Sequence, residues 1–144
     1  MIETYGQHLT VKLIGILNYE TGHVYCEERE KYDAQAFIEF MSNILTFYPE
    51  GKIVMILDNA RIHHAKITKE FLKSHADRLQ LEFLPAYSPN LNLIEGLWGW
   101  MKRDVIRNRF FSKLYEIKTV VKQFIDYVNT IPKQVIDRLC IGLN

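Results

Sequence analysis

The fold of this chain is decided by the run Ile53-Val54-Met55-Ile56-Leu57-Asp58-Asn59-Ala60-Arg61-Ile62-His63-His64. Its first five residues are apolar without alternation, which is typical of a strand covered on both faces in the middle of a sheet. The run then reaches a carboxylate, Asp58, and ligands in open α/β sheets collect at the carboxyl ends of such strands. We therefore expect a central strand over residues 52–57, with helices on each side of the sheet and a site at its end.

A second stretch, Leu84-Pro85-Ala86-Tyr87-Ser88-Pro89-Asn90-Leu91-Asn92-Leu93-Ile94-Glu95-Gly96-Leu97-Trp98, delivers another carboxylate at the beginning of a helix. Its two prolines exclude regular structure and stiffen the loop between them. Asn90 is a suitable cap for a helix that we expect from Leu91 to about Arg107. Glu95 falls near the N-terminus of this helix, where the backbone dipoles favour a negative charge. The expected apolar stripe of the helix consists of Leu91, Ile94, Trp98, Met101 and Val105.

The remaining sequence predicts a hairpin and further helices around these two stretches. Residues 10–17 are rich in β-branched and apolar side chains, residues 18–22 form a turn, and residues 23–26 form the returning strand. Apolar spacing of three and four predicts helices after the N-cap Asp33, over 65–75 with Ile67 and Phe71 inward, over 113–129 and from Pro132. With a short strand over 81–84, the order is that of an α/β domain with a mixed sheet.

Composition places the chain among globular proteins of one domain. It has 144 residues, 48% of them hydrophobic and 24% charged, which is enough apolar sequence for a core and too little charge for disorder. No apolar run approaches the ~20 residues of a membrane span, and the first residues lack the features of a signal peptide. Cys26 and Cys140 form no close-spaced ligand pair, so neither a disulfide framework nor a zinc site is indicated. We expect a cytoplasmic protein without membrane contact.

The net charge of +1 hides an uneven distribution along the chain. Residues 1–50 carry three basic and eight acidic side chains, whereas residues 51–144 carry fifteen and nine. Within residues 102–122 the count is seven basic to two acidic. Such clustering can form a phosphate-binding surface, but the charges alone favour the other interpretation, the solvated faces of ordinary helices.

Asp58 and Glu95 are the candidate ligands of a divalent metal ion. Hard cations such as Mg²⁺ take oxygen ligands and often use only one or two carboxylates, with water and substrate phosphate completing the shell. Each residue also has a structural alternative: Asp58 can cap a turn or helix, and Glu95 can offset the dipole of its helix. Judged singly, the structural role is at least as good for each.

The residues around both carboxylates favour the metal site. The pattern Asp58-Asn59-Ala60-x-x-His63, the block Leu84-Pro85-x-Tyr87-Ser88-Pro89-x-Leu91-Asn92-x-Ile94-Glu95, and Trp98 with Lys102 together resemble the catalytic domain of DDE-type transposases. The resemblance is greatest to the bacterial insertion-sequence branch of the mariner-like superfamily. It covers nearly the whole chain, from the hairpin at 12–22 to the tail at 130–140.

This resemblance implies a ribonuclease H-like fold, a mixed sheet flanked by helices, and a requirement for Mg²⁺ or Mn²⁺. The implied chemistry is hydrolysis of DNA phosphodiesters at element ends, followed by attack of the freed 3′-hydroxyl on target DNA. Members of the family use three carboxylates. Asp58 matches the second of them and Glu95 the third.

The first carboxylate has no match. In the family it lies on the first strand, upstream of the hairpin, and here Glu3 is the only acidic residue in that region. The sequence therefore predicts that residues 1–144 are a partial catalytic domain that lacks its first strand and the N-terminal DNA-binding helices. The chain is either the second reading frame of an element that needs frameshifting or a degenerate copy. We expect it to be inactive alone, because two carboxylates position a metal pair worse than three.

The other motif residues receive supporting roles. Asn59 and His63 orient Asp58 or touch phosphate, and loop and helix capping is an equally good interpretation. Tyr87 and Asn92 hold the loop that aims Glu95, with direct DNA contact as the alternative. His64 is expected to be a surface residue.

Residues on the predicted helix after Glu95 complete the set. Lys102, Arg103 and Arg107 are the expected phosphate contacts. Trp98 is expected to pack against the sheet and Trp100 to be exposed on the other face of the helix.

Three functions are therefore considered. The leading one is the catalytic portion of a DNA transposase, with element ends and target DNA as partners, a homo-oligomeric assembly, and an upstream-frame product that carries the first aspartate. A second is another ribonuclease H-like nuclease that acts on a hybrid or junction, which the Pro-Tyr-Ser-Pro loop disfavours. A third is a non-catalytic remnant that binds DNA or associates with an intact transposase.

Overall fold

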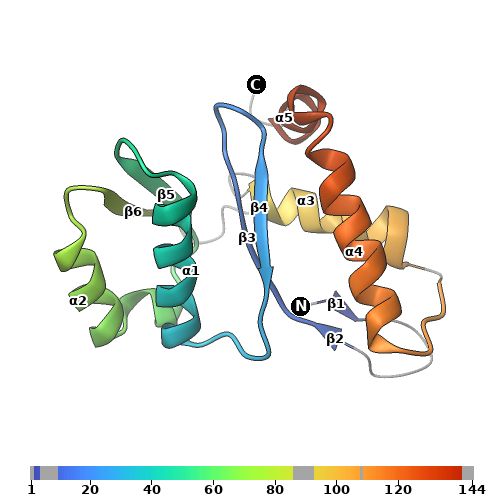
Figure 1. The fold of residues 1–144 in the computed structure, drawn as a ribbon, viewed down its shortest axis with the longest axis horizontal. Helices are drawn as coiled ribbons and strands as arrows, with labels where there is room; N and C mark the ends of the chain where they lie inside the picture. Colours follow the sequence, from blue (N-terminus) through green and yellow to red (C-terminus); the bar gives the residue numbers. More distant parts are fainter. Residues whose placement is uncertain (1, 4–9, 86–92, 108, 141–144) are drawn as a thin grey trace. The chain divides into compact units, whose positions relative to one another are not determined.

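The computed structural model describes residues 2–3, 10–85, 93–107 and 109–140, and these form two compact units (Figure 1). The hairpin unit comprises residues 1–30 and 93–144, and the β5 unit comprises residues 31–92. Antiparallel and parallel strand pairs both occur, with helices beside them, as the mixed α/β prediction requires. In the described ranges, no helix combines the length and apolar character needed to cross a membrane.

The β5 unit is built on a parallel strand pair. Its elements are α1 (Ala34–Phe47), β5 (Ile53–Leu57), the 3₁₀ helix η1 (Arg61–His64), α2 (Lys66–Ser74) and β6 (Leu79–Phe83). Strands β5 and β6 run in register from Ile53 beside Leu79 to Leu57 beside Phe83. Parallel strands need a crossover connection, and η1 and α2 provide it. Residues 58–60, the Asp58 turn, follow directly from the end of β5.

Helix α1 begins where the sequence predicts. The Asp33 carboxylate accepts the N–H of Ala36 at 2.9 Å, as an N-cap should. The buried side of the helix carries five apolar residues, namely Ala36, Phe37, Phe40, Met41 and Ile44. Past the end of α1, Gly51 has φ +81°, and its carbonyl accepts from the Arg78 guanidinium at 2.7 Å. The guanidinium thus joins the end of α1 to the beginning of β6.

Two burial predictions for this unit are wrong. Strand β5 is buried only at alternate positions: Met55 is buried, whereas Val54 and Ile56 are 51% and 45% exposed. An apolar run fixes a strand but not the number of its covered faces, and the parallel register gives Val54 and Ile56 the polar neighbours Gln80 and Glu82. In α2, Ile67 is exposed and Thr68 is buried instead. The Thr68 hydroxyl donates to the Ile62 carbonyl at 3.0 Å, and this bond turns it inward.

The hairpin unit begins with a two-residue strand, β1 (Ile2–Glu3), which the sequence analysis did not anticipate. It pairs antiparallel with β2 (Thr10–Val11), and the predicted hairpin follows as β3 (Leu13–Leu17) and β4 (Val24–Glu28). At the hairpin turn Gly22 has φ +80°, and a Cβ there would lie 2.1 Å from the Pro132 carbonyl oxygen. Only glycine meets both demands.

Among its described residues, the hairpin unit has four helical segments: α3 (Leu93–Met101), the π-helical η3 (Lys102–Ile106), α4 (Leu114–Val128) and α5 (Pro132–Cys140). The predicted helix to Arg107 is therefore α-helical only as far as Met101 and continues as a π-helix. Asn129, after α4, pairs with strand β4 through its side chain. It accepts from the Val24 N–H at 2.8 Å and donates to the Val24 carbonyl at 2.9 Å, as a neighbouring strand would.

The apolar core of this unit lies between the hairpin and its helices. From α3 it takes Leu93, Leu97, Trp100 and Met101, and from α4 it takes Ile117, Val121, Phe124 and Val128. Trp98 packs against the hairpin as predicted, because two of its ring atoms lie 3.0 Å from the place where a Cβ on Gly15 would stand.

The expected exposure of Trp100 is wrong, since only 5% of this residue is accessible. Its indole N–H donates to Asp104 at 2.8 Å, and the Arg138 guanidinium lies 4.0 Å above its ring. The predicted stripe placed Trp98 in the core and Trp100 outside it. The buried stripe of α3 is displaced by about one residue from this prediction, and Trp100 is therefore buried.

Candidate active site

The carboxylate of Asp58 stands at the end of β5 with 63% of its side chain exposed. Oδ1 accepts the N–H of Ala60 at 3.3 Å, so the side chain closes a turn on its own backbone. The carboxylate is held from the protein side while remaining open to solvent. That arrangement suits a group which must meet a ligand from outside.

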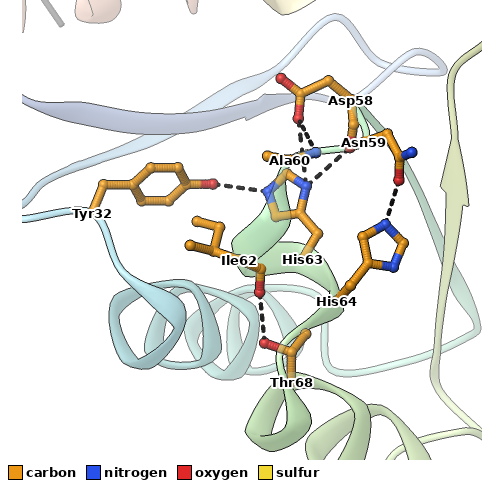
Figure 2. A network of polar contacts seen from close by, with 8 residues as sticks. All are labelled: Tyr32, Asp58, Asn59, Ala60, Ile62, His63, His64 and Thr68. Carbon is orange, nitrogen blue, oxygen red and sulfur yellow. Dashed lines mark hydrogen bonds and ion pairs between the residues drawn. The ribbon is translucent and has the colours of Figure 1, made fainter. Parts of the chain in front are cut away.

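His63, in η1, fixes the same turn from below. The residue is 5% exposed, and its Nδ1 lies 3.0 Å from the Asp58 carbonyl oxygen and 3.5 Å from Oδ1 (Figure 2). Nε2 lies 3.1 Å from the hydroxyl of Tyr32. The ring centroid is 4.5 Å from that of Phe37 and 6.4 Å from that of Phe83. The imidazole is therefore buried between aromatic rings with both nitrogens engaged.

The proton positions on His63 follow from its partners. A carbonyl oxygen can only accept, so Nδ1 carries the hydrogen that points to Asp58. In the neutral form of the ring, Nε2 then accepts, and the Tyr32 hydroxyl donates to it. Neither nitrogen has a lone pair directed at solvent, so His63 is not arranged as a metal ligand. It instead holds the backbone from which the Asp58 carboxylate projects.

Tyr32 was missed by the sequence analysis. Burial of its hydroxyl end and the nearby Asp58 carboxylate raise the pKa of Tyr32 to about 12. One signal in the sequence could have found it: Tyr32 precedes the N-cap Asp33, the position from which a hydrophobic staple reaches the fourth residue of a helix. That fourth residue is Phe37, whose ring packs on His63.

Asn59 and His64 form a separate, exposed pair beside this turn. The Asn59 side-chain oxygen and the His64 Nε2 are hydrogen-bonded partners, and the His64 ring lies 4.4 Å from that of Phe83. His64 is exposed, as predicted. Asn59 is therefore tied to the end of η1 rather than to the Asp58 carboxylate.

Glu95 lies in the first turn of α3, in the hairpin unit, and is exposed. Its neighbours Leu93 and Leu97 are buried, so the helix is anchored by apolar contacts on the side away from the carboxylate. Asp58 and Glu95 belong to different units. Tyr87 and Asn92 lie outside the described residues.

The three predicted phosphate contacts lie on and after η3. Lys102 is half-buried, whereas Arg103 and Arg107 are exposed. The N–H of Arg107 donates to the Lys102 carbonyl at 2.7 Å, a five-residue step that belongs to the π-helix. Among the residues that the structure describes, no group of three or more histidine, cysteine, aspartate or glutamate side chains is arranged to hold a metal.

Most of this sequence matches the model of a protein family. Residues 1–118 match the model described as DDE superfamily endonuclease. A relative from Shigella sonnei, the insertion element IS630 uncharacterized 39 kDa protein, is 29% identical over 132 residues. That match covers 91% of this chain but 38% of the relative, so the chain spans well under half of its length.

Solved structures with the same fold come from Mos1 transposase. In the paired-end complex with the left transposon end, the likeness covers 96% of this chain and 46% of the Mos1 chain, with TM-score 0.66 and 16% identity. In the Mos1 catalytic domain with raltegravir and Mg, it covers 90% and 75%, with TM-score 0.63 and 15% identity. The likeness confirms the predicted ribonuclease H-like fold.

Proposed function

The chain belongs to the DDE superfamily of endonucleases, and we propose that it is the C-terminal portion, residues 1–144, of a DNA transposase catalytic domain. In the complete enzyme this domain cleaves phosphodiesters at element ends and transfers the strand to target DNA. The observation that carries the proposal is the Asp58 turn. A backbone amide holds its carboxylate, a buried histidine holds its backbone carbonyl, and 63% of the side chain remains exposed.

Asp58 and Glu95 are proposed to converge on a divalent cation, Mg²⁺ or Mn²⁺. The donor set fits, because both are exposed oxygen donors and hard cations take one or two carboxylates together with water and phosphate. When bound, the cation would activate the attacking oxygen and stabilise the leaving oxygen of a phosphodiester. The chain's own part is to hold the two carboxylates rigidly and to keep the His63 nitrogens away from the metal.

DNA is the proposed partner, in the form of element ends and target. Lys102, Arg103 and Arg107 would contact backbone phosphates. Lys102 and Arg103 lie in η3, which continues directly from the α3 helix of Glu95, and Arg107 follows η3. Tyr87 and Asn92, outside the described residues, are proposed to support the position of Glu95, and Asn59 would steady the far end of the Asp58 turn. The Mos1 complex with its transposon end supports nucleic acid as the ligand class.

The assembled enzyme is proposed to be a homo-oligomer. Residues 1–144 are proposed to be inactive by themselves, because two carboxylates position a metal pair worse than the three that the family uses. The check is incubation of residues 1–144 with element-end DNA and Mg²⁺, for which we expect no strand cleavage. Robust cleavage that Asp58→Ala abolishes would show that the two carboxylates suffice.

Shared metal binding by the two carboxylates is tested by Mn²⁺ titration of four proteins: wild type, Asp58→Asn, Glu95→Gln and the double variant. Each single change should weaken binding by more than about tenfold, since even changes outside the first coordination shell commonly cost that much. The double variant should be little worse than either single one if both residues hold one ion. A stoichiometry that falls by one ion with each single change, while the remaining ion keeps its wild-type affinity, would instead place the carboxylates at separate sites.

Asp126→Asn is the matched control for this titration. The Asp126 side chain is 66% exposed, similar to that of Asp58, and its surface pair with Lys122 is of a kind that contributes little. Its Mn²⁺ affinity should equal that of the wild type.

A second candidate is a non-catalytic remnant that associates with an intact transposase. It is favoured by the exposed apolar side chains Val54 and Ile56 on a strand that, among the described residues, pairs only with β6. Gel filtration with and without a full-length family member distinguishes it. Complex formation without any Asp58-dependent Mn²⁺ binding would favour the remnant over the catalytic portion.

A further inference from the structure

Tyr32, His63 and Asp58 form a chain of hydrogen bonds that joins three separate parts of the β5 unit (Figure 2). Tyr32 precedes α1, His63 lies in η1, and Asp58 ends β5. Tyr32 and His63 are 31 positions apart, so the contact is a property of the fold and not of a local turn. The chain ends at the residue that carries the candidate metal ligand.

We propose that Tyr32 is a positioning residue for the Asp58 carboxylate, acting through the His63 imidazole. The inference deepens the proposed function and rests on it in one respect, namely that Asp58 binds the cation. The residue itself would touch neither metal nor DNA. Its task would be to keep the His63 ring in the single orientation and tautomer that support the Asp58 turn.

The burial of His63 makes the Tyr32 hydroxyl necessary. A ring nitrogen in a site that is 5% exposed has little access to water, and a buried acceptor without a partner is costly. If the hydroxyl is removed, the Nε2 lone pair loses its partner, and only water entering beside residue 32, which is 45% exposed in the wild type, or a turn of the ring can replace it. A ring that turns, or whose hydrogen moves to Nε2 to donate to such a water, no longer donates to the Asp58 carbonyl.

The direction of the hydrogen bonds supports the same assignment. The Asp58 carbonyl requires a hydrogen on Nδ1, which leaves Nε2 as an acceptor and the Tyr32 hydroxyl as its donor. A hydroxyl whose pKa is raised to about 12 stays protonated throughout the neutral range, so it can serve as the donor there.

Packing limits the other ways in which His63 could be held. The Phe37 and Phe83 rings flank the imidazole, and neither offers a hydrogen-bond partner at the ring edge. The backbone of η1 is fixed separately, by the His63 N–H to the Ala60 carbonyl at 3.0 Å and by Thr68 to Ile62. Tyr32 is thus the only described side chain besides Asp58 that has a polar contact with the ring.

The first measurement is the tautomer of His63 by ¹⁵N–¹H imidazole NMR on the wild-type chain and on Tyr32→Phe. We expect the wild type to show the hydrogen on Nδ1, and Tyr32→Phe to show a mixture of tautomers or exchange broadening. Tyr127→Phe is the matched control, because it removes the hydroxyl of a tyrosine that is 55% exposed in the other unit. A wild-type ring protonated at Nε2, or an unchanged ring in Tyr32→Phe, overturns the proposal.

The second measurement is Mn²⁺ affinity, from paramagnetic broadening of amide signals around Asp58, in a double-mutant cycle of Tyr32→Phe and His63→Asn. Changes one step outside the metal's ligands commonly cost about tenfold in affinity, and we expect that loss for Tyr32→Phe in the wild-type background. In the His63→Asn background, Tyr32→Phe should have little further effect. An equal loss in both backgrounds would mean that Tyr32 does not act through His63.

The two measurements separate failure of this inference from failure of the proposed function. If the wild type shows no Asp58-dependent Mn²⁺ binding, the proposed function fails, while the NMR comparison still decides whether Tyr32 controls His63. If binding depends on Asp58 but is unchanged in Tyr32→Phe, only the positioning role of Tyr32 is wrong.

Discussion

The two candidate ligands are held in place by different physical means. Asp58 stands on a turn fixed by polar contacts, to Ala60, to His63 and through His63 to Tyr32. Glu95 stands on a helix fixed by apolar contacts, with Leu93 and Leu97 buried beneath it. A hydrogen-bond network fixes the orientation of a side chain, but it requires a partner for every member. An apolar stripe tolerates small changes of side chain as long as the total buried volume is kept. The two candidate ligands should therefore be lost in different ways.

The largest effect should come from the apolar half of this comparison. Leu97→Ala removes a side chain with no exposed surface from the contact between α3 and its core, and such changes cost about 2–5 kcal/mol of unfolding free energy. The measurement compares the urea unfolding midpoints of the wild type, Leu97→Ala and a control variant. Leu114→Ala, at a position that is 38% exposed, is the control and should cost much less. Equal losses would mean that α3 is not the anchor of its unit.

The second effect concerns charge and should distinguish the two units. Neutralising Lys102, Arg103 and Arg107 together should reduce the slope of log affinity for duplex DNA against log salt by about 2.7, since each phosphate contact contributes about 0.9. The measurement is a filter or anisotropy titration at several salt concentrations.

The matched control for the salt titration replaces the three exposed lysines of α2, namely Lys66, Lys69 and Lys73. It removes the same charge from the β5 unit and should leave the slope close to that of the wild type. If the α2 variant flattens the slope instead, the phosphate-binding surface belongs to the β5 unit.

The same contrast explains what could be predicted from the sequence. Elements with a strong period or a clear cap were found: the Asp33 cap is present, and the strand before Asp58 lies at Ile53–Leu57. The burial of single residues was not predicted correctly, because the buried stripe of a helix can rotate by one residue while the spacing of apolar residues stays the same. That rotation buried Trp100. The number of covered faces on β5 depends on which elements pack against it, and the sequence of the strand does not specify them.

For the candidate site, the motifs in the sequence predict Asp58, Glu95 and His63. They do not identify Tyr32, whose contact with His63 spans 31 positions and exists only once α1 is placed beside η1. The π-helical turn at Lys102–Ile106 was also missed, since nothing in residue spacing separates a five-residue step from a four-residue one.

The smallest predicted effect returns to the polar half of the comparison. The N–H of Ala36, which donates to the Asp33 carboxylate, and the nearby Lys31 ammonium hold the pKa of Asp33 below its ordinary value of 3.8. A depressed folded pKa means that the cap contributes fully above 3.8 and that its contribution is lost as the pH falls through the folded value. The amide of Ala36 should therefore lose protection from hydrogen exchange below pH 3.8, after correction for intrinsic rates, while amides in the α4 core keep theirs. Asp33→Asn caps the same helix without titrating, so its Ala36 protection should not change over this range. Equal loss in both proteins would assign the acid sensitivity of α1 to another group.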